Sequence, residues 1–274
     1  MKKGLLEKSD WEEIGEFFGN IVYRNSNMKK IIIITINDNK ITHENIEKEV
    51  NEKLKINPKV AIFLSRHRSK SGKPTLTTHP IGNYSEALFG GREKTLSISS
   101  PKIMTHLLRI MKKNADQNKM YHQLCFEVTH HGPYMSIPTL YVEVGSTEEE
   151  WVKEKPSFIL SESILELLKN YHYEDDFKEK IPVLIGIGGG HYAPRFTDVA
   201  LEKNIAFGHM IPNYQIKKGV INDEMIEKTI NATPNFNGMY IHRKSMKKSE
   251  FTTLKNWFKE KDINVFSSKE LSDL

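Results

Sequence analysis

The chain has 274 residues, enough to bury a large core, and suits one large α/β domain or two closely packed halves. Its single cysteine, Cys125, excludes an intramolecular disulfide framework and a zinc site built from several thiolates, which favours a reducing compartment. No apolar run approaches the roughly 20 residues that span a bilayer, and the net charge of +5 permits an anionic partner without requiring one, so we predict a soluble, cytoplasmic protein.

Apolar, β-branched runs along the chain predict strands. They lie at residues 31–36, 60–64, 124–128, 140–144, 183–187, 205–207, 239–241 and 263–266. Helical patterns fall between them, at residues 44–54, 103–113, 148–155, 163–171, 224–230 and 250–259. Because strand and helix mostly alternate, we predict an α/β fold, a three-layer sandwich around a mixed, mostly parallel sheet, in a single domain spanning 1–274.

Several helix starts are marked by residues that cap backbone N–H groups. Thr147 and Glu150 have the spacing of a capping box at the start of their helix. Asp223 and Ser249 are the expected N-caps of the two helices nearest the end of the chain.

Two kinds of segment interrupt this pattern. Residues 65–101 contain many Gly, Ser, Thr and Pro but few strand or helix signals, which predicts a long functional loop. The densest charge runs, at residues 174–180 and 244–248, are expected to be solvated surface without a function of their own.

The first reactive motif follows the strand predicted at 60–64. Arg66, His67 and Arg68 are succeeded by Lys73 and His79, so two histidines and several cations share one loop. Ligands of open α/β sheets bind outside the carboxyl ends of the strands, where this motif begins. We expect Arg66 and Arg68, together with Arg195 of the third motif, to bind phosphate or carboxylate as planar bidentate donors. An ordinary basic surface loop is the alternative.

The second motif ends the strand predicted at 124–128 with His130 and His131, followed by Gly132-Pro133. Neighbouring strand residues point to opposite faces unless the strand has turned, and Gly-Pro favours such a turn. Glu143 lies in an otherwise apolar strand, where burial would require a cation, a metal or a proton as its partner. A surface-facing Glu143 is the alternative.

The third motif is the glycine triplet Gly188, Gly189 and Gly190, which runs directly into His191. Glycines at a strand exit let the backbone approach a ligand and present N–H groups to an anion or oxyanion. The segment continues with Arg195 and Asp198, and His209 ends the next predicted strand.

A dinucleotide-binding loop is disfavoured at this triplet. Gly186 and Gly188 fit the start of G-x-G-x-x-G, but His191 occupies the last glycine position. Pro194 is also expected to interrupt the helix that would have to follow.

The residue types in the three motifs suit a metal or general acid–base catalysis. Imidazoles and carboxylates bind Zn²⁺, although no H-E-x-x-H spacing exists. The candidate ligands are His67, His79, Glu143, Asp198 and His209. In the metal-free alternative, histidines alone transfer protons, and His130, His131 and His191 are the candidates for catalysis.

Taken together, the three motifs resemble the archaeal and plant type of D-aminoacyl-tRNA deacylase. The likeness rests on Ser65-Arg66-His67 through His79-Pro80-Ile81-Gly82-Asn83, on Thr129-His130-His131-Gly132-Pro133 and on Gly188-Gly189-Gly190-His191-Tyr192-Ala193-Pro194-Arg195. It extends over most of the chain, with the amino-terminal ~30 residues least diagnostic, because termini vary most.

The resemblance implies hydrolysis of the ester between a D-amino acid and the 3′ end of tRNA. It also implies Zn²⁺ dependence, a monomer, and a fold similar to peptidyl-tRNA hydrolases and nucleoside phosphorylases. On this hypothesis the tRNA end contacts Arg66, Arg68, Lys73, Arg195 and the glycine triplet, beside the three catalytic candidates. The attacking water is activated by zinc or histidine, and assistance by the vicinal ribose hydroxyl is the alternative.

Other functions remain to be separated from this one. A peptidyl-tRNA hydrolase would cleave an N-blocked ester, a nucleoside phosphorylase would release a base with phosphate, and a noncatalytic module would bind tRNA without turnover. A covalent acyl-enzyme is disfavoured, because there is no G-x-S-x-G elbow and Cys125 sits in an apolar strand. Tyr134 and Tyr192 are candidate walls for D/L discrimination, or simply packing aromatics.

Overall fold

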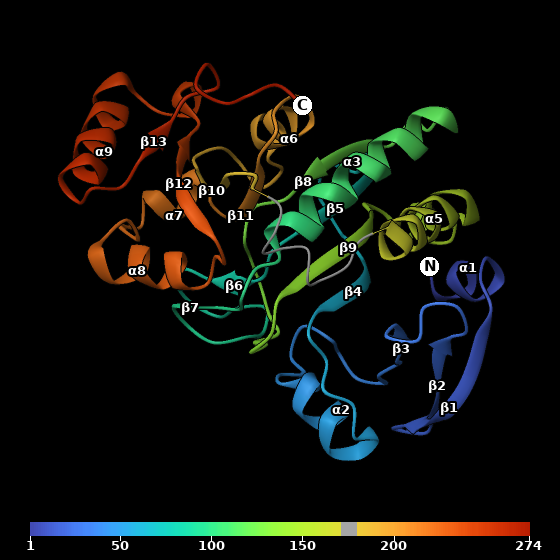
Figure 1. Ribbon diagram of the computed structural model, residues 1–274. Helices are drawn as coiled ribbons and strands as arrows, with labels where there is room; N and C mark the ends of the chain where they lie inside the picture. Colours follow the sequence, from blue (N-terminus) through green and yellow to red (C-terminus); the bar gives the residue numbers. More distant parts are fainter. Residues whose placement is uncertain (171–179) are drawn as a thin grey trace.

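The computed structural model describes residues 1–170 and 180–274. Its helices are α1 Lys2–Glu7, α2 Ile46–Leu54, α3 Pro101–Gln117, α4 Glu148–Trp151, α5 Glu154–Asn170, α6 Pro194–Glu202, α7 Asn213–Ile216, α8 Asp223–Asn231 and α9 Lys248–Glu260. Its strands are β1 Trp11–Phe17, β2 Asn20–Asn25, β3 Ile32–Ile33, β4 Ala61–Arg66, β5 Thr75–His79, β6 Gly82–Asn83, β7 Thr95–Leu96, β8 Gln123–Phe126, β9 Thr139–Gly145, β10 Val183–Ile187, β11 Ala206–Ile211, β12 Phe236–Ile241 and β13 Val265–Phe266 (Figure 1).

Two four-stranded sheets form the centre of the molecule. The parallel sheet has the order β11-β10-β12-β13, and the mixed sheet has the order β4-β9-β5-β8 with only the β9–β5 pair antiparallel. The chain after β8 joins the two sheets, because Val128 N–H donates to the His191 carbonyl and Thr129 N–H to that of Met210. The prediction of a mixed, mostly parallel sheet is confirmed.

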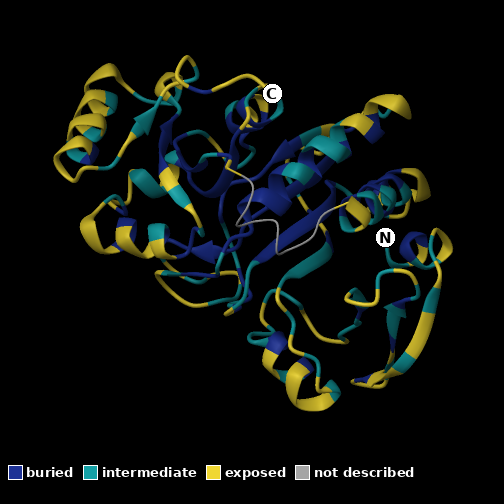
Figure 2. Cartoon of the chain, viewed as in Figure 1, coloured by how far each residue is buried: buried dark blue, intermediate teal, exposed yellow. Residues whose placement is uncertain are grey.

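Apolar side chains on both faces of these sheets create the layers. Alternate residues of β9, such as Leu140 and Val142, pack into one core with α3, α5 and α6, while Ile185 and Ile187 of β10 face a second core with α8 and α9. A third core lies under α2 and the antiparallel sheet β1-β2-β3. The central strands are accordingly buried and the outer helix faces exposed (Figure 2), so the three-layer sandwich is confirmed.

Several element boundaries differ from the sequence prediction. The run at 31–36 forms only the short β3, and β1 and β2 were not predicted. The helices expected at 148–155 and 163–171 are instead α4 and one long α5, whose predicted last residue, Tyr171, lies outside the described residues. Long-range packing decided these boundaries, since α5 contacts both α1 and α3.

The segment at 65–101, predicted as an irregular loop, contains a central strand. β5 lies between β9 and β8, and all five of its residues are buried. Its Thr-rich sequence was read as loop, although threonine is β-branched and favours strands. The prediction of a single domain over 1–274 stays a prediction.

Helix starts also correct the sequence prediction. α6 begins at Pro194, because the first helical position needs no N–H donor, so proline does not prevent a helix here. Asn222, not Asp223, caps α8, and Lys247, not Ser249, precedes α9. Thr147 does precede α4, but its side chain makes no capping bond.

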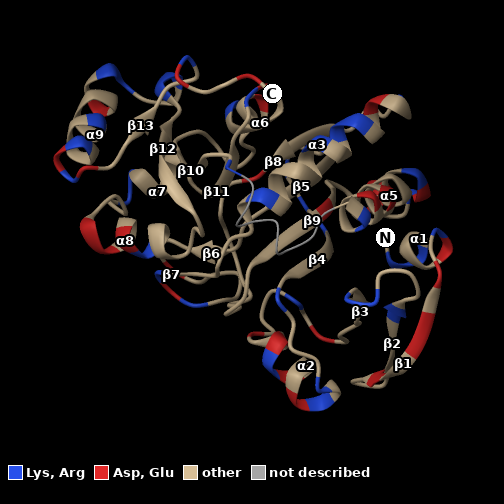
Figure 3. Ribbon diagram, in the orientation of Figure 1, with Lys and Arg blue, Asp and Glu red and all other residues tan. Residues whose placement is uncertain are grey.

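Charged side chains lie mainly outside the central strands (Figure 3). Lys244, Lys247 and Lys248 are exposed, as expected for a solvated surface, whereas most of the predicted charge run at 174–180 lies outside the described residues. Among the described residues, no helix is both long and apolar enough to cross a membrane.

Candidate metal and active site

Strand alternation places a polar site on one face of the mixed sheet. Leu140, Val142 and Val144 of β9 face the core under α3 and α5, so Glu143 points to the opposite face. On β5, Thr77 pairs with Glu143 and His79 is the next residue on the same face. His79 and Glu143 are both buried, and His79 Nε2 lies 3.6 Å from Glu143 Oε2.

The chain leaving β8 supplies a second buried carboxylate and the paired histidines. Glu127 is fully buried, with its Oε2 3.5 Å from Nε2 of His130. The rings of His130 and His131 contact each other and His79, with centroid distances of 4.2 to 5.0 Å. The turn expected at Gly132 therefore brings both histidines to the same site.

His67 and His191 complete the cluster from two other strand ends. His67 follows β4, and its Nδ1 lies 3.4 Å from both Glu127 Oε2 and Glu143 Oε2. His191 follows the glycine triplet after β10, and its Nε2 lies 3.0 Å from Glu127 Oε2. The two rings stack at 5.4 Å. Five histidines and two glutamates thus converge, which we call the histidine–glutamate cluster (His67, His79, His130, His131, His191, Glu127 and Glu143).

Backbone carbonyls fix the orientation of three of the imidazoles. Nδ1–H of His79, His130 and His131 can donate to the carbonyls of Pro80, Val128 and Gly132, at 3.1, 2.7 and 2.5 Å. This arrangement leaves Nε2 as the acceptor whenever the ring is neutral, the usual state of a metal-binding histidine.

The electrostatics of the cluster depend on its carboxylates. Burial opposes ionisation of Glu127 and Glu143, but the facing histidines outweigh burial and lower the pKa of both. Burial likewise lowers the pKa of His67 and His79, yet hydrogen bonding to Glu143 and the nearby carboxylate charges give a net raised pKa. Burial also lowers the pKa of His131, to about 4.

These residues fit a metal ion by their donor chemistry. Three subsets have ligand atoms within 4.8 Å of one another: His79, His130 and His131; His67, Glu127 and His191; and His79, Glu127 and Glu143. Nε2 of His130 and Oε2 of Glu127 are both acceptors, so without a proton or cation between them they repel. Within the described chain, His79 Nε2 and both Glu127 oxygens lack a well-aligned hydrogen bond. A cation bound among them would satisfy all three.

Two predicted metal ligands lie away from this cluster. Asp198 is exposed on α6, and no metal-capable subset of the described residues includes it. His209 is fully buried inside β11, with its ring nitrogens 3.1 Å from Thr129 Oγ1 and 3.0 Å from the Ser97 carbonyl. Both of its nitrogens already have protein partners, so His209 is a structural residue.

The geometry does not separate the predicted metal ligands from the predicted catalytic histidines. His67, His79 and Glu143 were predicted as ligands, and His130, His131 and His191 as catalytic groups, but all six lie in one cluster. Glu127 was missed, although its position in the apolar run 124–128 carries the same signal as Glu143.

The predicted substrate-binding cations lie in two places. Arg66 and Arg68 are exposed beside His67, with each guanidinium about 5 Å from the ring of Trp151, and Lys73 is exposed on the same connection. Arg195 instead donates from Nε to Tyr240 Oη at 3.0 Å, next to the parallel sheet.

The glycine triplet is shaped by its backbone. Gly188 and Gly189 have φ values of 108° and 85°, a region that favours glycine. A Cβ on Gly188 would lie 2.4 Å from Ser245 Oγ. The Gly188 N–H already donates to the Ile211 carbonyl, so it is not available to an oxyanion.

Three further side chains were candidates for specificity or catalysis, namely Tyr134, Tyr192 and Cys125. Tyr192 lies against the cluster, with its ring 5.7 Å from those of His67 and His191, whereas Tyr134 lies under the guanidinium of Arg92 at 4.0 Å. Cys125 is buried in β8, and burial raises the pKa of its thiol. A cysteine nucleophile is therefore disfavoured.

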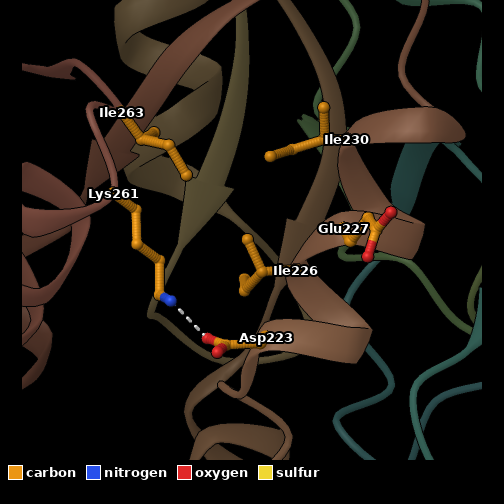
Figure 4. A pocket seen from close by; sticks show the side chains of 6 residues that line it. All are labelled: Asp223, Ile226, Glu227, Ile230, Lys261 and Ile263. Atoms are coloured by element: carbon orange, nitrogen blue, oxygen red, sulfur yellow. Dashed lines mark ion pairs between the residues drawn. The ribbon is translucent and has the colours of Figure 1, made fainter.

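A separate groove lies between α8 and the chain leading to β13 (Figure 4). It is lined mainly by the side chains of Ile226, Ile230 and Ile263, and a 2.6 Å ion pair between Asp223 and Lys261 crosses one end. It contains no member of the histidine–glutamate cluster and few groups that could carry chemistry, so we do not regard it as the active site.

Comparison with known proteins identifies close relatives. A family model described as D-aminoacyl-tRNA deacylase matches residues 54–266. The chain is 40% identical to a D-aminoacyl-tRNA deacylase of Thermococcus onnurineus over 233 residues, 84% of this chain and 80% of the relative. It is 33% identical to one of Methanosarcina acetivorans, covering 100% of this chain and 89% of the relative.

A solved structure has the same fold. A crystal structure described as that of a conserved protein of unknown function matches with a TM-score of 0.84 and 28% identity. The match covers 98% of this chain and 90% of the other. The two proteins thus share the layered α/β architecture over 98% of this chain and 90% of the other.

Proposed function

The chain belongs to the D-aminoacyl-tRNA deacylase family, and we propose that it hydrolyses the ester between a D-amino acid and the 3′ end of tRNA at the histidine–glutamate cluster. The products are the free D-amino acid and tRNA. The observation that carries this proposal is the convergence of five histidines on two buried glutamates, where strands of the mixed sheet meet the chain that leaves β10 of the parallel sheet. Such a site suits water activation and oxyanion stabilisation.

The cofactor that fits this donor set is Zn²⁺. The proposed ligands come from the group of His79, His130 and His131 and the group of His79, Glu127 and Glu143, which leaves His191 free for proton transfer. When bound, zinc polarises a carbonyl and lowers the pKa of bound water to roughly 7.

His191 is the group best suited to move the proton. Its side chain is 38% exposed, while Glu127 beside it is fully buried. If Nε2–H donates to Glu127, Nδ1 is left as an acceptor that can take a proton from the attacking water. The oxygen of that water bonds to the ester carbon, the bond to the ribose oxygen breaks, and His191 returns the proton to the ribose oxygen.

The tRNA end is held by cations beside His67. Arg66 and Arg68 stack near Trp151, whose indole N–H donates to the His67 carbonyl at 2.8 Å. Phosphate groups bound by these arginines and by Lys73 would lie next to the cluster. Arg68 also pairs with Glu148, but this ion pair is exposed and a phosphate can replace it. Arg195 and the glycine triplet have other partners beside the parallel sheet and contribute less to this proposal.

D/L discrimination is assigned to the wall formed by Tyr192. Its hydroxyl lies 3.3 Å from Ser146 Oγ, which fixes the ring beside His67 and His191. A rigid wall can accept one arrangement of amino group and side chain and clash with its mirror image.

We propose further that the enzyme is a monomer that works in the cytoplasm. Every residue of the cluster comes from one chain, so catalysis needs no second subunit. The aminoacylated tRNA it would act on is a cytoplasmic molecule. Light scattering of the active protein would test the monomer.

The test is deacylation of matched D-tyrosyl-tRNA and L-tyrosyl-tRNA, with chelator treatment and zinc add-back. We expect rapid loss of the D ester only, abolished by the chelator and restored by zinc. Full activity in protein without stoichiometric zinc would remove the metal from the proposal. Hydrolysis of neither ester would overturn it, and N-blocked aminoacyl-tRNA and nucleosides with phosphate would then test the two alternative enzymes.

A further inference from the structure

Two large apolar side chains are exposed next to the histidine–glutamate cluster. Leu88 and Phe89, at 76% and 67% exposed, lie in the hairpin loop between β6 and β7. Single exposed apolar residues are common and need no explanation. Two neighbouring exposed apolar residues beside a proposed nucleic-acid site do require an explanation.

The base of this hairpin is bonded to the paired histidines. β6 and β7 close the loop, and Gly82 N–H of β6 donates to the His131 carbonyl at 2.9 Å. Ile81, just before β6, pairs with His130 in a β-bridge. The loop therefore begins next to the backbone of His130 and His131, two members of the histidine–glutamate cluster.

The tip of the hairpin is held against the same segment. Gly132 N–H donates to the Phe89 carbonyl at 3.1 Å. A Cβ on Gly90 would lie 1.8 Å from the Ile41 carbonyl oxygen, and a Cβ on Gly132 would lie 2.2 Å from Gly91 N. Such close backbone contact is possible only with glycine. It holds Phe89 against Gly132, the residue after His131.

Charged side chains of both signs surround this pair of apolar residues. Arg92, on the same loop, is about half exposed, lies 4.0 Å over the Tyr134 ring and pairs with Glu44. Lys94 is exposed at the end of the loop, and Lys218 bonds to Glu86 on its other side. An exposed aromatic side chain held beside the site is complementary to the flat base of an unpaired nucleotide.

We propose that Phe89, supported by Leu88, stacks against the terminal base at the 3′ end of the tRNA. This inference rests on the proposed function, because the hydrolysed ester is carried by the ribose of that terminal nucleotide. Unpaired bases are commonly recognised by stacking on aromatic side chains. The platform thus binds the base while the cluster acts on the ester.

The experiment uses an uncharged RNA hairpin with an unpaired 3′ end whose last base is the fluorescent analogue 2-aminopurine. Stacking on Phe89 quenches its fluorescence, so we expect the wild-type protein to quench the probe. Phe89→Ala and Phe89→Leu should lose the quenching and bind about tenfold more weakly, whereas Phe89→Tyr should keep both. Phe89→Leu retains apolar bulk without an aromatic face.

Tyr121→Ala is the matched control, since Tyr121 is an aromatic residue that is 64% exposed and lies outside the hairpin. It should leave the quenching unchanged, and thermal unfolding checks the fold of every variant. Unchanged quenching and affinity in Phe89→Ala and Phe89→Leu would overturn the proposal that Phe89 stacks on the terminal base. Hydrolysis of D-tyrosyl-tRNA by the wild-type protein would still support the proposed function in that case. Failure of the wild-type protein both to bind the RNA and to hydrolyse the ester would overturn both.

Discussion

The two central sheets differ in what they bury. In the parallel sheet, Leu184 of β10 faces one apolar core, and Ile185 and Ile187 face another. In the mixed sheet, one face of β9 is equally apolar, but the opposite face carries Glu143 beside His79. Burial of a charged group is unfavourable unless the group is paired. The buried Glu143 carboxylate therefore lowers the stability of the mixed sheet, but it forms a site that can bind a cation or protons.

The buried histidines of the two sheets make the comparison specific. The hydrogen-bond partners of His209, in the parallel sheet, are the Thr129 hydroxyl and backbone carbonyls, and burial lowers its pKa to about 4. His79, in the mixed sheet, is just as buried, yet Glu143 gives it a net raised pKa. The neighbouring carboxylate, rather than burial alone, decides whether a histidine here can hold a positive charge.

The largest expected effect comes from neutralising the carboxylate of Glu127, which follows β8 of the mixed sheet. Glu127→Gln keeps the shape but replaces a carboxylate that lies within 3.5 Å of His67, His130 and His191. We expect kcat/KM for D-tyrosyl-tRNA to fall about 10³-fold, because the variant loses the carboxylate that orients His191, and general acid–base catalysis contributes on this order. Steady-state kinetics measures the loss, and atomic emission shows whether bound zinc is lost with it.

Glu150→Gln is the matched control for this change. Glu150 also pairs with a buried histidine, His122, at 3.0 Å, but lies outside the histidine–glutamate cluster. Its kcat/KM should stay close to that of the wild type. Equal losses in both variants would show that general destabilisation, not the cluster, explains the effect.

A smaller effect is expected from substituting His209, the buried histidine of the parallel sheet, on the pH dependence of stability. The pKa of His209 is lowered to about 4 in the folded protein and lies near 6.5 in the unfolded chain. As pH falls below about 6.5, the unfolded state therefore binds a proton that the folded state does not, and stability falls by up to about 1.4 kcal/mol per pH unit.

His209→Gln removes this proton uptake. The stability difference between wild type and variant should shrink between about pH 6.5 and about pH 4, as measured by urea unfolding at several pH values. A difference that stays constant over this range would mean that His209 is not held neutral, and the contrast between the two sheets would be lost.

The sequence was sufficient for the parts of the fold and site that local patterns determine. The apolar run at 140–144 predicted β9, and the carboxylate within it identified Glu143. Strand ends carrying His67, the His130-His131 pair and His191 pointed to a common site, because strand ends meet at sheet edges.

Long-range contacts determined what the sequence did not predict. Thr75 to Thr78 read as a loop, because only pairing with β8 and β9 makes them a central strand. His209 was expected in the site, but its direction depends on Ser97, more than a hundred residues earlier in the chain. The Gly132 contact with Phe89 is likewise a property of the folded backbone.

The smallest expected effect tests whether carboxylates also raise the pKa of a histidine near the surface, His43. His43 lies between Asp38 and Glu49, with ring nitrogens 2.9 Å from each. Burial lowers the pKa of His43, but the hydrogen bonds and charges of the two carboxylates outweigh it, and the net pKa is raised. A raised folded pKa adds stability that is present below about pH 6.5 and is lost as pH rises through the folded pKa.

His43→Gln keeps hydrogen bonding but cannot become charged, so it isolates this contribution. Asp38 is 59% exposed and the pair is screened by solvent, so we expect the wild type to be more stable by at most about 1 kcal/mol near pH 5.5, with no difference near pH 8.5. Urea unfolding at both pH values measures the gap, and added salt should reduce it at the lower pH only. A gap of the same size at both would show that packing, not charge, makes His43 stabilising, and that the carboxylate rule drawn from the mixed sheet does not extend to the surface.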